Sequence, residues 1–183
     1  MFLRLARAID SFNQYLGRLL SWFILFIVVL VCINVVARYV FQASEIWLSE
    51  LAQFMHAMVF LGVAGYTLLD NDHVRVDLLY EKFSRRRKSA VDLVGTLFFL
   101  IPVCITLIYF SWGIVLSSWK IFEKSAEYGG MPGVFILKSF MWVFSIVLIL
   151  QGVSVIISSF RTILLRNKVI KRKAMFRSPR LQG

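Results

Sequence analysis

Four long stretches of this chain contain no Asp, Glu, Lys or Arg, and they constrain its fold more than any other feature. They cover residues 19–37, 51–69, 93–119 and 139–160. The hydrocarbon core of a bilayer is about 30 Å thick, so a helix that crosses it needs about 20 apolar residues. In lipid every backbone group must bond within its own segment, and these continuous runs lack the alternation of barrel strands. Each stretch is therefore predicted to be a transmembrane helix.

The composition agrees with this interpretation and argues against a soluble domain. Hydrophobic residues make up 59% of the 183 residues, and charged residues make up 17%. Soluble domains average about 45–50% and about 25% for the same two classes. A soluble fold of this size has too little interior for so many apolar side chains. We therefore expect an all-α integral membrane protein with four transmembrane helices.

The basic residues predict how these helices are oriented. The cytoplasmic flanks of membrane helices are enriched in Lys and Arg. With four spans, the N-terminal segment, the second loop and the C-terminal tail share a side, and they carry 17 of the 21 basic residues. Both termini are therefore expected in the cytoplasm. The net charge of +11 suits anionic lipid headgroups there, whereas no groove-reading motif or aromatic platform indicates nucleic-acid binding.

The chain is expected to have three parts. Residues 1–18 carry apolar side chains at helical spacing, which predicts an amphipathic helical segment in the cytoplasmic interface. These side chains are Leu5, Ile9, Phe12 and Leu16. Residues 19–160 are expected to form the four-helix transmembrane domain, and residues 161–183 form a basic cytoplasmic tail.

The sequence carries no motif that indicates an enzyme. Cys32 and Cys104 both fall inside predicted spans and form no CxxC pair, so they are expected to behave as small hydrophobic residues. His56 and His73 are 17 positions apart, about 25 Å along a helix, which is too far to hold one haem. The spans also lack the charged side chains that usually mark an ion path. We expect His56 to serve packing or a bond between helices rather than proton transfer.

Several short motifs lie in order around the first two spans. They are Arg38-Tyr39-Val40-Phe41, then Ser44, Trp47 and Glu50-Leu51, then Phe60-Leu61-Gly62, then His73-Val74-Arg75-Val76-Asp77. This order and spacing resembles the small permease (Q) subunit of TRAP transporters, the tripartite ATP-independent periplasmic family. The resemblance extends over roughly residues 18–160. Ser49 departs from it, because many members have a first glutamate there.

The resemblance implies a non-catalytic subunit in a bacterial or archaeal inner membrane. In this family a large permease (M) subunit holds the sodium and substrate sites, and a periplasmic substrate-binding protein captures organic acids. The small subunit acts as a scaffold for the large one, so no cofactor is expected in this chain. One alternative is a stand-alone, homo-oligomeric small transporter or channel, and another is a redox membrane enzyme.

The resemblance and the charge pattern together single out candidates for structural or subunit-interface roles. They are Arg38, Trp47, Glu50, His73, Arg75, Asp77 and Glu127. Arg38 and Glu50 are expected to form an ion pair at the outer membrane edge, although separately solvated charges there remain an open alternative. The group around His73 is expected to brace the second loop or to meet the partner. Glu127 is expected to touch the binding protein.

Overall fold

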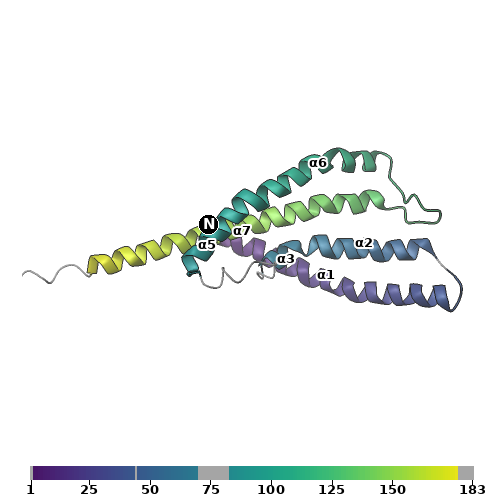
Figure 1. The fold of residues 1–183 in the computed structure, drawn as a ribbon, viewed down its shortest axis with the longest axis horizontal. Coiled ribbons are helices and arrows are strands. Elements are labelled where there is room, and N and C mark those ends of the chain that lie inside the picture. The colour runs from purple at the N-terminus through teal and green to yellow at the C-terminus, as the bar shows by residue number, and fades with distance from the viewer. Residues whose placement is uncertain (1, 44, 70–82, 177–183) are drawn as a thin grey trace, which may run out of the picture.

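The computed structural model describes residues 2–43, 45–69 and 83–176, and all regular structure in these segments is helical (Figure 1). The elements are α1 (Phe2–Tyr39), α2 (Ile46–Gly62), α3 (Ala64–Leu69), α5 (Arg85–Gly95), the π-helical turn η1 (Thr96–Leu100), α6 (Ile101–Lys120) and α7 (Val134–Phe176). Within this part of the chain, four helical stretches are long and apolar enough to cross a membrane. The predicted all-helical, four-span architecture is confirmed, and the direction of insertion stays a prediction.

The first span differs from the expected pattern at its N-terminal end. α1 is one continuous helix through residue 18, so the predicted interfacial segment continues directly into the span. In this segment Leu5 and Phe12 are each 51% exposed, whereas Ala6 and Asn13 are buried. Small and polar side chains allow a closer approach of two helices than Leu and Phe do. This end of α1 therefore packs through its less apolar face.

The helix α7 is the centre of the bundle. It contacts α1, α2, α3, α5 and α6, whereas α6 packs mainly on α7 and on the adjoining η1. Figure 1 shows the helices converging near the N-terminus and spreading toward the loops at the opposite end. Beyond the converging end, α7 continues away from the bundle. The side chains that hold the helices together are therefore expected to concentrate where the helices converge.

A close approach of α3 to α1 and α7 depends on a glycine. A Cβ atom at Gly65 would lie 2.5 Å from Cγ1 of Val147 and 2.8 Å from Oδ1 of Asn13. Next to this contact, a small apolar core is formed by Ala64, Leu68, Cys104 and Leu148. Tight contact through small residues is the usual way in which membrane helices associate.

The third span is interrupted near its middle. The N–H of Ile101 donates to the carbonyl of Thr96, five residues earlier, which closes the π-helical turn η1. Pro102 follows immediately, and proline has no N–H to donate to an earlier carbonyl. A π-helical turn is a common way to absorb such an irregularity within a helix.

Candidate functional site

A buried polar network joins α1 to α7 at the converging end of the bundle. We call Asp10, Asn13, Gln151 and Ser154 the polar network. The Asn13 amide donates to Oε1 of Gln151 at 2.6 Å, and the Gln151 amide donates to Oδ1 of Asp10 at 3.0 Å. The hydroxyl of Ser154 donates to the same Asp10 oxygen at 2.7 Å. Gln151 and Asn13 are each 1% exposed, so these bonds form inside the helix bundle.

The polar network is built for cohesion between helices. Three hydrogen bonds connect its members, and Oδ1 of Asn13 is a buried acceptor without a hydrogen-bond partner in the described part of the chain. A cavity of about 200 Å³ lies beside the network and is lined by Asp10, Asp92 and several hydroxyl groups. Among the described residues, no cluster of three or more His, Cys, Asp or Glu side chains is placed to hold a metal ion.

At the spreading end, Glu50 ties α2 to the segment between α6 and α7. We call residues 121–133 the α6–α7 loop. One carboxylate oxygen of Glu50 accepts a hydrogen bond from the hydroxyl of Ser125, and the other accepts the N–H of Met131 at 2.6 Å. Glu50 thus links α2 to the α6–α7 loop at this end.

The conformation of the α6–α7 loop places the Ser125 hydroxyl and the Met131 N–H against Glu50. A Cβ atom at Gly130 would lie 2.5 Å from Ser125 and 2.8 Å from Oε2 of Glu50, so a larger residue there must displace these side chains. Lys138 forms an ion pair with Glu123 at 2.5 Å, which fastens the loop to α7. The hydrogen bond from Lys138 holds the pKa of the Glu123 carboxyl below its ordinary value.

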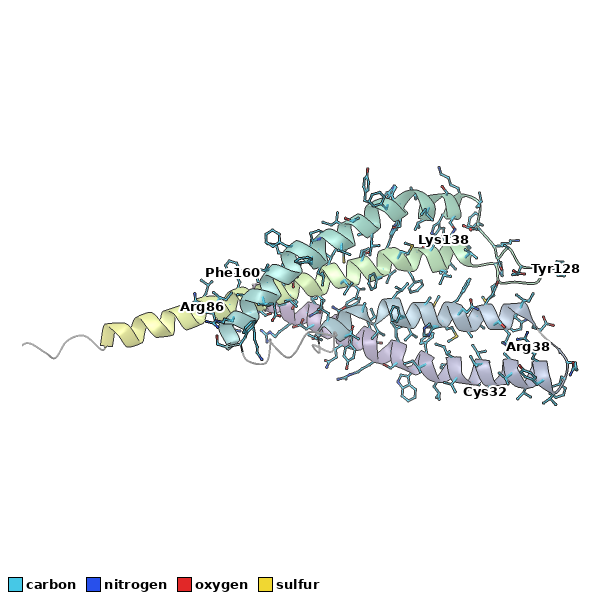
Figure 2. The ribbon with its side chains drawn as sticks, in the orientation of Figure 1. Cys32, Arg38, Arg86, Tyr128, Lys138 and Phe160 are labelled. Atoms are coloured by element: carbon cyan, nitrogen blue, oxygen red, sulfur yellow. The ribbon has the colours of Figure 1, made fainter. Side chains whose placement is uncertain are left out.

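The predicted ion pair between Arg38 and Glu50 does not form in the described part of the chain. The carboxylate of Glu50 is already engaged by Ser125 and Met131, and Arg38 is exposed in the last turn of α1. Figure 2 shows Arg38 on α1 and Tyr128 on the loop at the spreading end. Because Ser125 and Met131 of the loop already donate to the two carboxylate oxygens of Glu50, this carboxylate does not need a bond from the flexible side chain of Arg38.

The other predicted candidates are distributed as follows. Trp47 lies in the first turn of α2 and is 43% exposed. Glu127 is exposed in the α6–α7 loop, where its N–H donates to Oγ of Ser125 at 3.2 Å and its carbonyl accepts from Gly130 at 3.1 Å. His73, Arg75 and Asp77 lie outside the described residues.

A groove lined by four polar and three apolar side chains lies between α1 and α2. It encloses about 510 Å³, and we call it the α1–α2 groove. The Asn34 amide donates to Oγ of Ser49 at 2.8 Å within it. Gln53 and His56 also line the groove and are exposed. Packing or a bond between helices was expected for His56; its ring stacks on Phe60 with centroids 6.4 Å apart, and no hydrogen bond of its side chain is formed within the described residues.

The polar network was not predicted from the sequence, although a signal for it exists. Ala6, Asp10, Asn13 and Gly17 recur at spacings of three and four, which places small and polar residues on one helical face. Small and polar faces are typical of contacts between membrane helices. The apolar set Leu5, Ile9, Phe12 and Leu16 of the same helix predicted only a segment in the membrane interface.

Comparison with known proteins gives one match. The family model described as "Tripartite ATP-independent periplasmic transporters, DctQ component" matches residues 27–162, which is more than half of the chain. No curated protein and no solved structure matches significantly. The family is one of transporter components and not of enzymes, and with four apolar helices it indicates a multi-pass membrane protein. The chain therefore belongs to the family of DctQ components, the small permease components of tripartite ATP-independent periplasmic (TRAP) transporters.

Proposed function

We propose that this chain is the small membrane subunit of a sodium-coupled TRAP importer of organic acids. Its partners are a large permease (M) subunit and a periplasmic substrate-binding protein. The chain acts as a scaffold for the large subunit, in the inner membrane, with both termini in the cytoplasm. The observation that carries the proposal is the family match over residues 27–162.

The chemistry of the spans supports a scaffold rather than a carrier. The four apolar runs contain no Asp, Glu, Lys or Arg, whereas ion-coupled carriers usually place such groups in their spans. Gln151, the largest fully buried polar side chain described, is engaged by its neighbours Asp10 and Asn13. Sodium and substrate sites then belong to the large subunit.

The candidate residues have corresponding proposed roles. Glu50 holds the α6–α7 loop against α2, which is a structural role. Arg38 and Trp47, exposed at the same end of the molecule, are available to a partner subunit, and Glu127 is available to the binding protein. His73, Arg75 and Asp77 brace the second loop or meet the large subunit. The basic tail contacts anionic lipids on the cytoplasmic side.

The test is co-purification followed by reconstitution. The tagged chain is purified from native membranes in mild detergent, and the co-purifying proteins are identified by mass spectrometry. We expect a membrane protein of many spans to accompany it. In proteoliposomes, uptake should require both membrane proteins, the binding protein and a sodium gradient, and replacing sodium with potassium is the control. Recovery of the chain alone, as a homo-oligomer that transports by itself, would instead favour a stand-alone transporter or channel.

A further inference from the structure

The α1–α2 groove presents two polar side chains, Gln53 and His56, within the candidate span of α2. Gln53 and His56 lie in the first half of the candidate span Ile46–Leu69. They are three residues apart in α2, so they share one helical face. Both are exposed, and neither has a hydrogen-bond partner within the described part of the chain. Hydrocarbon cannot satisfy an amide or an imidazole, so this face needs an occupant with polar groups.

The remaining polar groups of the groove extend the same surface. Asn34 of α1 donates to Ser49 of α2, and this bond between two lining residues of the groove connects the two helices. This single bond uses one of the two amide hydrogens of Asn34, and its carbonyl oxygen remains open to an acceptor role. The groove thus offers both donors and acceptors, arranged on two helices, to a third helix.

A second exposed groove provides a contrast. It lies along α6, encloses about 670 Å³, and is lined by Ile105, Ile108, Tyr109, Trp112 and Gly113. Its lining is almost entirely apolar, so acyl chains can cover it without loss of hydrogen bonds. The larger groove is therefore compatible with lipid, whereas lipid over the α1–α2 groove leaves Gln53 and His56 without hydrogen-bond partners.

We propose that the α1–α2 groove is the docking face for a transmembrane helix of the large permease subunit. That helix carries uncharged hydrogen-bonding side chains at the depth of Gln53 and His56. The inference rests on the proposed function, which supplies the partner, and it adds the face and the residues that the partner meets. A charged partner group does not fit, because the groove offers it no opposite charge and burial of an unpaired charge is costly.

Site-specific photo-crosslinking tests this placement with a matched pair of positions. A photoreactive phenylalanine analogue replaces either Phe60, which stacks on His56, or Phe110 on α6. The two side chains are 70% and 72% exposed, so they differ in face and not in accessibility. Irradiation in native membranes should give an adduct with the large subunit from position 60 and none from position 110. An adduct from position 110 only, from neither position, or with a second copy of this chain at position 60 would overturn the inference.

A pair of substitutions tests the chemistry of the face separately. Gln53→Leu with His56→Leu removes the polar groups, and Tyr109→Leu on α6 is the matched control. Loss of two membrane hydrogen bonds should lower the affinity for the large subunit by about tenfold. The melting temperature of the purified chain verifies that each variant is folded. If the double variant binds as tightly as the control, the face is wrong while the proposed function stands. If the unaltered chain fails to co-purify any large subunit, the proposed function itself fails.

Discussion

Replacement of Gln151 by leucine removes the centre of the polar network. Gln151 is 1% exposed and bonds to both Asn13 and Asp10. Leucine has a similar size, so the substitution changes the hydrogen bonds more than the packing. Asp10 keeps the bond from Ser154 at 2.7 Å, whereas the amide of Asn13 loses its partner and stays buried.

The expected cost follows from these contacts. Two interhelical hydrogen bonds in a membrane contribute about 0.6 kcal/mol each on average. A buried donor left without a partner adds about 1–3 kcal/mol. The free energy of unfolding of Gln151→Leu should therefore be lower by about 2–4 kcal/mol. The double variant Asn13→Ala with Gln151→Leu removes both partners and should lose less than the sum of the two single variants, by about 0.5–3 kcal/mol.

Unfolding in mixed micelles of mild detergent and sodium dodecyl sulfate measures this difference, with circular dichroism and tryptophan fluorescence as independent probes. Ser158→Ala is the control, because Ser158 is exposed and bonds only to the carbonyl of Val155 in its own helix. The control should stay within about 0.5 kcal/mol of the unaltered chain. A Gln151→Leu variant as stable as the control, or strict additivity in the double variant, would refute the role given to the polar network.

Three predictions concern the α6–α7 loop. Glu50→Ala removes the acceptors for Ser125 and Met131, so amide hydrogen exchange in the α6–α7 loop should accelerate. The isosteric Glu50→Gln should retain part of the protection. Equal exchange in the unaltered chain and both variants would contradict the link between Glu50 and the loop. Gly130→Ala places a Cβ atom 2.8 Å from Glu50 and should accelerate exchange in the same loop by displacing it; unchanged exchange would show that the loop yields without cost. Because the pKa of Glu123 is lowered, its ion pair stabilises the loop fully above the ordinary glutamate pKa of about 4.3 and is lost as the pH falls through the lowered pKa. Carboxyl resonances recorded during an NMR titration should thus show Glu123 titrating at lower pH than an exposed glutamate, and Lys138→Met should reduce the difference.

Different hydrogen bonds hold the helices together at the two ends of the bundle. At the converging end, the polar network connects α1 to α7 through bonds buried in the bundle. At the spreading end, Glu50 connects α2 to the α6–α7 loop. Between them, the faces of α1 and α6 remain exposed along most of their spans. Fixed ends with open sides suit the proposed arrangement, in which α1 and α2 meet a partner helix and lipid covers α6.

Much of the fold was determined by sequence alone. A run of about 20 residues without charge has one stable solution in a bilayer, because only a helix satisfies its own backbone there. The four spans, the all-helical class and the family therefore followed from local composition and from short motifs such as the one that begins at Arg38. None of these properties requires knowledge of which helix lies beside which.

The contacts between helices were decided only by the tertiary structure. Asp10 and Gln151 are 141 positions apart, and Glu50 and Ser125 are 75 apart, so no local pattern specifies either pair. The sequence offered Arg38 as the partner of Glu50 because opposite charges lay near one another in the chain. The fold instead brought the donors of the α6–α7 loop to that carboxylate. In lipid, apolar side chains do not determine which face of a helix packs against its neighbours. Small and polar residues determine that face, because they allow close approach and form hydrogen bonds between helices.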